Sequence, residues 1–142
     1  MANKTALITG GSKGIGYGVA EALVKENANV AITSRTKAAA DEAAASLNRL
    51  GKGEALGIAA DVRNAEEQQK AVDSVLRKWG KLDVLVANAG VGFFGSIETL
   101  TPEQWQETID TNLTGVFYSI KASLPALKKS KGYHYHGKPR RY

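Results

Sequence analysis

The sequence contains no cysteine, so disulfide bonds and thiolate chemistry are excluded. It also lacks any apolar run near the roughly 20 residues that a helix needs to cross a bilayer. Residues 1–11 show neither the apolar core nor the cleavage site of a signal peptide. From these absences we expect a cytoplasmic protein that does not associate with membranes. Hydrophobic residues (43%) and charged residues (23%) are otherwise present in the proportions of an ordinary globular domain.

Acidic residues are missing from the end of the chain, and the formal net charge of +5 originates there. Residues 128–142 contain no acid, and their basic residues are Lys128, Lys129, Lys131, Lys138, Arg140 and Arg141. No recognised nucleic-acid module surrounds this tail, so we interpret it as a solvated end and expect no nucleic-acid partner. His134 and His136 supply two imidazoles without a neighbouring carboxylate or thiolate, and no metal site is predicted.

Short apolar segments alternate with longer helical segments, a pattern typical of βαβ units. Within the first helical segment, Ile15, Val19 and Leu23 recur every four positions and predict its buried face. Asn64 and Thr101 are predicted N-caps, and Gly80 is predicted to end the helix that Asn64 begins. Asn112, Gly115 and Pro125 are predicted weak points of the last helix. Strands are expected at 5–10, 28–34, 54–61 and 82–90, and helices at 14–27, 36–50, 64–79 and 101–129.

Right-handed crossovers restrict how these segments assemble. They predict an α/β fold, a Rossmann-like doubly wound parallel sheet with strand order 3-2-1-4 and helices on both faces. Such a sheet has a switch point between its first and fourth strands, where open α/β sheets bind ligands. Residues 1–131 are expected to form a dinucleotide-binding half-domain, and residues 132–142 an aberrant basic tail.

The turn after the first strand reads TGGSKGIG, residues 9–16. Glycines permit a sharp turn and a close backbone approach to a pyrophosphate, whose charge would meet free N–H groups at the following helix N-terminus. The spacing departs from the common G-x-G-x-x-G fingerprint, so the turn alone is weak evidence for a nucleotide site. Its position directly after a strand and before an amphipathic helix strengthens that evidence, and a tight turn without a ligand is the alternative.

Three further motifs follow in order: ADV at 60–62, ANAG at 87–90 and DTNLTGVF at 110–117. With the glycine turn, they make the chain resemble a classical short-chain dehydrogenase/reductase over roughly residues 4–131. The resemblance implies hydride transfer between a nicotinamide dinucleotide and a small carbonyl or alcohol substrate. It also implies a set of cofactor-binding residues: Gly10, Ser12, Lys13, Gly14, Ile15 and Gly16 at the phosphates, Asp61 and Val62 at the adenine, and Asn88, Ala89 and Gly90 beside the riboses. Asn88 is expected to tie neighbouring strands together as well.

Charge predicts which dinucleotide is preferred. An acid at the end of the second strand would bind a ribose 2′-OH and repel a 2′-phosphate, but the chain has Ser34 and Arg35 there. Because Lys13 supplies a second cation, NADP(H) is predicted over NAD(H).

Catalysis in the resembled family uses an Asn, a Ser and a Tyr with a Lys four residues later. Asn112 matches the Asn, and the residues after Gly132 provide no match for the others. A reading frame shifted by one nucleotide after Tyr133 could encode a Ser-containing strand, so a frameshift is one hypothesis for this ending. The chain is therefore expected to be inactive or nearly so. A noncatalytic nucleotide-binding module and a half-enzyme completed by a partner chain remain alternatives. A missing fifth strand would leave the fourth strand's edge bare, which predicts self-association unless the tail covers part of that edge.

Overall fold

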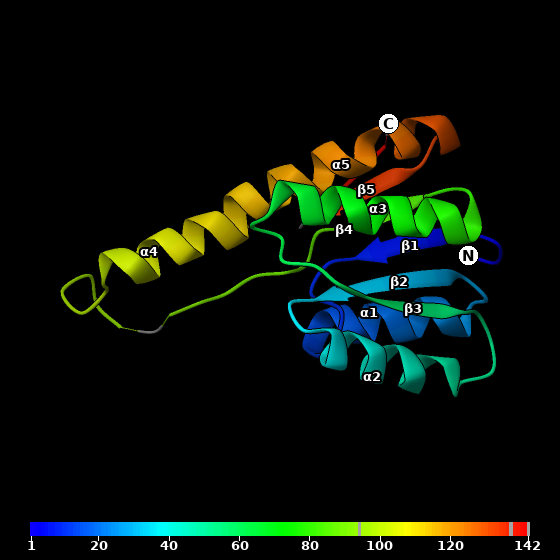
Figure 1. Cartoon of the computed structure of the whole chain (residues 1–142), viewed down its shortest axis with the longest axis horizontal. Helices are drawn as coiled ribbons and strands as arrows, with labels where there is room; N and C mark the ends of the chain where they lie inside the picture. Colours follow the sequence, from blue (N-terminus) through cyan, green and yellow to red (C-terminus); the bar gives the residue numbers. More distant parts are fainter. Residues whose placement is uncertain (94, 137, 142) are drawn as a thin grey trace.

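The computed structural model describes residues 1–93, 95–136 and 138–141, with side chains for residues 1–93 and 95–132. One sheet forms the centre, with helices on both of its faces (Figure 1). Its strands are β1 (Thr5–Ile8), β2 (Asn29–Ser34), β3 (Ala55–Ala59), β4 (Val84–Val86), β5 (Tyr133–His136) and β6 (Lys138–Arg141). The helices are α1 (Gly14–Lys25), α2 (Lys37–Asn48), α3 (Ala65–Trp79), α4 (Pro102–Ile109), a π-helix (Asp110–Thr114) and α5 (Gly115–Ser130).

The strand order is β3-β2-β1-β4-β5-β6, so the predicted order 3-2-1-4 is confirmed and extended at one side. Of the two outcomes expected at the β4 edge, coverage by the tail is observed, because β5 pairs with β4 in parallel and β6 pairs with β5 antiparallel. Parallel pairing needs only backbone N–H and C=O groups, which every non-proline residue carries. The premise for self-association through β4 is thereby removed.

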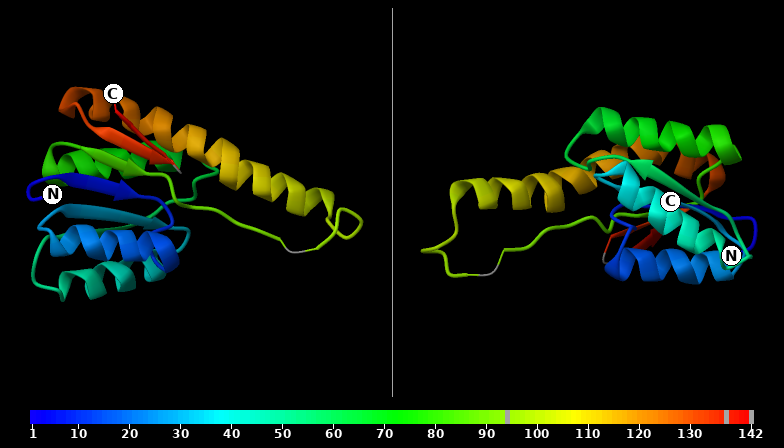
Figure 2. Two further views of the ribbon diagram at one scale, coloured as in Figure 1. Left: turned by 180° about the vertical axis from the view of Figure 1, so that it is seen from behind. Right: turned by 60° about the horizontal axis from the view of Figure 1, so that its bottom comes forward.

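Successive residues of β1 divide the core into two layers, since strand side chains alternate between faces. Ile8 belongs to the layer beneath α1 and α2, together with Val24, Ile32 and Leu47. Leu7 belongs to the layer beneath α3 and α5, with Val72, Leu85 and Leu127. Figure 2 shows the two pairs of helices on opposite sides of the strands.

Of the residues predicted to share the apolar face of α1, Val19 and Leu23 are partly buried against the core, but the fully buried positions lie one residue further along the helix. Gly16, Ala20 and Val24 are buried, whereas Ile15 is 81% exposed. A Cβ at position 16 would lie 2.5 Å from the Asn88 Nδ2 and 2.7 Å from the Gly10 oxygen. Small residues therefore face inward because α1 packs tightly against the turn that precedes it.

The predicted helix caps are confirmed. The Asn64 side chain accepts a hydrogen bond from the Glu67 N–H, and Gly80 ends α3 in the left-handed conformation. Thr101 and Gln104 form a reciprocal capping box at the start of α4. The long helix predicted at 101–129 is interrupted by the π-helix, which contains the predicted weak point Asn112. Figure 1 shows α4 projecting beyond the sheet, past the carboxyl ends of the strands.

Candidate functional site

The glycine turn after β1 brings the backbone close to the end of β4. Gly10 has φ +65, and a Cβ there would lie 2.8 Å from the Ala89 Cα. A larger residue would push these two segments apart. The turn therefore needs glycine both for its left-handed backbone and for the contact it makes.

No described side chain caps the backbone N–H groups at the N-terminus of α1. Lys13, its N-cap, is extended and makes no side-chain cap hydrogen bond, and the first turn contains no acidic residue. Gly14 follows with φ +62 and open space around it. The first N–H groups of a helix have no intrahelical partner and carry the positive end of its dipole. These groups can therefore meet an anionic ligand.

Thr9 and Asn88 connect the ends of β1 and β4. The buried Thr9 Oγ1 accepts hydrogen bonds from the N–H groups of Asn88 and Ala89, both at 3.1 Å. The Asn88 Nδ2 in turn donates to the Gly10 oxygen at 3.1 Å. Asn88 thus ties the two strand ends together, as expected from the sequence, and it holds both walls of the switch point in place.

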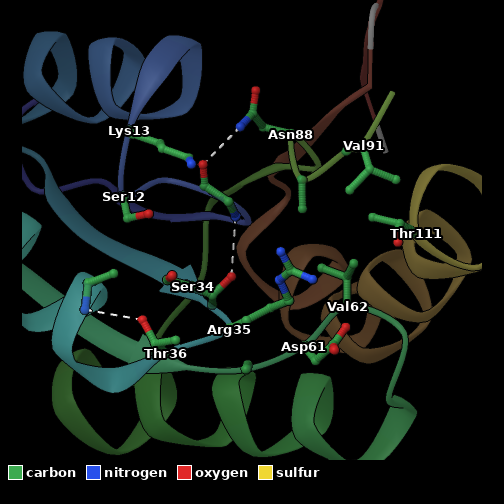
Figure 3. A pocket seen from close by; sticks show the side chains of 16 residues that line it. Ser12, Lys13, Ser34, Arg35, Thr36, Asp61, Val62, Asn88, Val91 and Thr111 are labelled. Atoms are coloured by element: carbon green, nitrogen blue, oxygen red, sulfur yellow. Dashed lines mark hydrogen bonds between the residues drawn. The ribbon is translucent and has the colours of Figure 1, made fainter. Parts of the chain in front are cut away.

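Polar and cationic groups follow β2. Thr36 caps α2 by accepting a hydrogen bond from the Ala39 N–H. The Arg35 side chain is 63% exposed, and its Nη1 lies 4.0 Å from the Glu107 Oε1 of α4. Figure 3 shows the Arg35 guanidinium extending between Ser12 and Lys13 on one side and Asp61 and Val62 on the other.

Asp61, after β3, is engaged by Arg63. The Arg63 Nη2 lies 2.6 Å from the Asp61 Oδ2, and the Arg63 N–H also donates to the Asp61 Oδ1. Hydrogen bonding from Arg63 lowers the pKa of the Asp61 carboxyl below its ordinary value of 3.8, and the charge of Arg35 adds to this. The carboxylate at this point of the site is therefore already neutralised by a partner.

These segments enclose a cavity of about 450 Å³ at the predicted switch point. It is within the range of small-molecule and cofactor sites. The predicted residues that line it are Gly10, Ser12, Lys13, Ser34, Arg35, Asp61, Val62, Asn88, Ala89 and Gly90. Gly14, Ile15 and Gly16 lie beside it in the first turn of α1 and are not among its lining residues.

Sequence reasoning missed several lining residues: Thr33, Thr36, Ala39, Ala60, Val91 and Thr111. Thr36 and Ala39 could have been found from their position directly after β2, at the first turn of α2. Thr111 is 8% exposed and comes from the π-helix. It lies in the motif DTNLTGVF, which was the available signal, although the motif alone does not show that a π-helix carries it to the cavity.

Asn112, the predicted catalytic Asn, lies outside the cavity lining in the π-helix. Its Oδ1 accepts a hydrogen bond from the Val91 N–H at 2.8 Å, and its Nδ2 donates to the Val91 oxygen at 2.7 Å. The observed role of this side chain is to hold the segment that follows β4.

The residues around the cavity have the chemistry that a dinucleotide needs. A glycine turn and a helix N-terminus without acceptors suit a pyrophosphate, and cations and hydroxyls gather at the end of β2. Within the described part of the chain, no group of three His, Cys, Asp or Glu residues is arranged to hold a metal ion. The helices described here include none that is long and apolar enough to span a membrane.

The model of the short-chain dehydrogenase family matches residues 4–133. This chain belongs to the short-chain dehydrogenase family. Human dehydrogenase/reductase SDR family member 4 is 37% identical over 136 residues, covering 93% of this chain and 48% of the human protein. Trans-4-hydroxycyclohexanecarboxylate dehydrogenase of Sinomonas cyclohexanicum is 37% identical over 137 residues, covering 93% of this chain and 53% of that enzyme. This short-chain dehydrogenase thus spans about half the length of the curated relatives it matches.

Solved structures of family members share the fold. An alcohol dehydrogenase from the archaeon Thermococcus sibiricus, complexed with 5-hydroxy-NADP, superposes with a TM-score of 0.87 at 37% identity. The match covers 92% of this chain and 56% of that structure. A 3-ketoacyl-ACP reductase from Sinorhizobium meliloti 1021 gives a TM-score of 0.84 at 38% identity, covering 90% of this chain and 50% of the reductase. As a member of this family, the protein has the fold of oxidoreductases that bind a nicotinamide dinucleotide.

Proposed function

We propose that this chain is the NADP(H)-binding portion of a short-chain dehydrogenase that acts on a carbonyl or alcohol. The observation that carries the proposal is the end of β2, where Arg35 lines the cavity and the strand-end residues Thr33 to Thr36 include no acid. A carboxylate there would bind the ribose 2′-OH and repel a 2′-phosphate, whereas an Arg pairs with the phosphate. This reasoning favours NADP(H) over NAD(H).

Neighbouring groups support the same preference. Lys13 lines the cavity, and it makes no ion pair with any residue the structure describes. The hydroxyl side chains of Ser12, Ser34 and Thr36 line it too. Asp61 is the lining carboxylate, and Arg63 neutralises it. The solved neighbour complexed with 5-hydroxy-NADP is consistent with this preference.

Each part of the cavity has a proposed role. The glycine turn and the α1 N-terminus would hold the pyrophosphate, Asp61 and Val62 the adenine, and Asn88 to Gly90 the riboses. NADP(H) supplies the hydride that family members transfer. The chain's own residues bind it, orient it and exclude water from its phosphates.

Turnover by this chain alone is expected to be absent or very slow. The family's proton donor is a Tyr whose pKa is lowered by a Lys four residues later. No tyrosine here has that partner, since Tyr17 precedes Glu21 and Tyr118 precedes Ala122. Tyr133 and Tyr135 are followed at that spacing by Gly137 and Pro139. Asn112 would be the part of the catalytic set that is present.

Parallel titrations with NADPH and NADH, followed by calorimetry or by the fluorescence of Trp79 and Trp105, test the proposal. We expect NADPH to bind at least about tenfold more tightly, because a charge-assisted contact to the 2′-phosphate contributes about 1.5 to 3 kcal/mol. Equal affinities would contradict the cofactor preference, and absence of binding to either would contradict the proposed function. In the same samples, NADPH should not be consumed when small aldehydes and ketones are added.

A further inference from the structure

The residue that faces Arg35 is an acid from a distant part of the chain. Glu107 lies near the end of α4, and its Oε1 is 4.0 Å from the Arg35 Nη1. The Glu107 side chain is 34% exposed and that of Arg35 is 63% exposed. Arg35 lines the cavity, so the carboxylate partner stands at the mouth of the proposed 2′-phosphate subsite.

Neighbouring acids already have partners of their own. Asp61 is held by Arg63 with a shortest contact of 2.6 Å. Asp110, which follows α4, accepts a hydrogen bond from the Gln106 Nε2 at 2.7 Å. Glu107 is therefore the acid, among the residues with described side chains, that forms an ion pair with Arg35.

The π-helix follows α4 directly and bears on the direction that Glu107 faces. Each residue of an α-helix corresponds to about 100° of rotation, and a π-helical turn accommodates one extra residue. The π-helix at Asp110–Thr114 thus affects which side of α4 is turned toward β2. The capping box formed by Thr101 and Gln104 fixes the other end of α4.

We propose that Glu107 is a specificity-determining residue, which competes with the cofactor's 2′-phosphate for Arg35. The inference rests on the proposed function and deepens it. When a 2′-phosphate binds, the Arg35 guanidinium must give up its ion pair with Glu107 to contact the phosphate. The Glu107 carboxylate, which stays nearby, also repels the phosphate. A cofactor without the 2′-phosphate leaves the ion pair intact. Glu107 therefore reduces the discrimination between NADP(H) and NAD(H) that Arg35 provides.

The test is the variant Glu107→Gln, which keeps the side chain's size and removes its charge. We expect Glu107→Gln to bind NADPH about threefold to fivefold more tightly than the parent chain does, because an exposed ion pair typically contributes up to about 1 kcal/mol. The affinity for NADH should be unchanged. The gain should shrink as salt is raised, because exposed charges are screened. The matched control is Glu103→Gln on the same helix, since Glu103 is exposed and makes no ion pair with the described residues. This control changes the net charge equally and should leave both affinities unchanged.

Combining Glu107→Gln with Arg35→Ala tests whether Glu107 acts through Arg35. In Arg35→Ala, adding Glu107→Gln should improve NADPH binding less than it does in the parent chain. Thermal unfolding should be nearly the same for Glu107→Gln and the parent, which separates specificity from stability. An unchanged NADPH-to-NADH ratio in Glu107→Gln, or an equal gain in Glu103→Gln, would overturn the inference while leaving NADP(H) binding intact. If the parent chain binds neither dinucleotide, the proposed function and this inference both fall.

Discussion

The side chain of Asn112 is joined to the backbone of Val91 by two hydrogen bonds, one accepted at 2.8 Å and one donated at 2.7 Å. Val91 lines the cavity, and Asn112 belongs to the π-helix between α4 and α5. An amide matches a backbone N–H and C=O at once, because it carries both an acceptor and donors. Asn112 thus helps to hold one wall of the cavity, although it does not line the cavity itself.

Replacing Asn112 with Ala removes both bonds, and we expect the free energy of unfolding to fall by about 1 kcal/mol. The Val91 amide should lose its protection against hydrogen exchange. Asn112→Asp keeps the acceptor for that amide and should retain most of the protection. Similar exchange in all three proteins would mean that the pair does not order this segment in solution.

Charge reversal at Arg35 tests cofactor preference directly. Arg35→Asp should weaken NADPH binding by about tenfold to a hundredfold relative to NADH, because it removes a charge-assisted contact and adds repulsion. Lys37→Asp is the matched control, since Lys37 pairs with Asp41 at 3.0 Å and does not line the cavity. A comparable loss in the control would point to overall charge instead of a specific phosphate contact.

Two glycines of the first turn should differ in their tolerance of a side chain. Gly14→Ala meets only the left-handed backbone, with φ +62 and nothing near its Cβ, and should cost about 1 to 2 kcal/mol. Gly10→Ala also forces a contact of 2.8 Å with the Ala89 Cα, which should add about 1 to 3 kcal/mol. Denaturant unfolding of the two variants measures the difference. Equal losses would contradict the close approach of the two strand ends.

Acid titration should reveal the Asp61–Arg63 pair. Because Arg63 lowers the folded-state pKa of Asp61 below its ordinary value of 3.8, the pair stabilises the fold above that value. The contribution is lost as pH falls through the lowered folded-state pKa. Arg63→Gln should therefore be less stable than the parent at neutral pH, and the gap should close in strong acid. Denaturation midpoints measured from neutral pH downward check this, and a gap independent of pH would exclude the pair as its cause.

Local signals in the sequence were sufficient to predict the helices and strands and the residues at which several of them begin or end. The caps at Asn64 and Thr101 and the stop at Gly80 were all predicted, because a cap is a contact within one turn of chain. The strand order followed from the alternation of elements together with the handedness of crossovers. Most of the cavity lining was anticipated from the motifs, because parallel strands end at the same edge of the sheet.

The tertiary structure decided what depends on contacts between distant segments. Ile15 is exposed because the small residues of α1 face the turn, and β5 covers β4 because the open edge offers backbone partners. Glu107 of α4 meets Arg35 after β2 across a separation in sequence that no local pattern spans. The periodicity of apolar residues within a segment indicates which face of a helix or strand is apolar. It does not indicate which residue of another segment will contact that face, because this depends on how all the elements pack together.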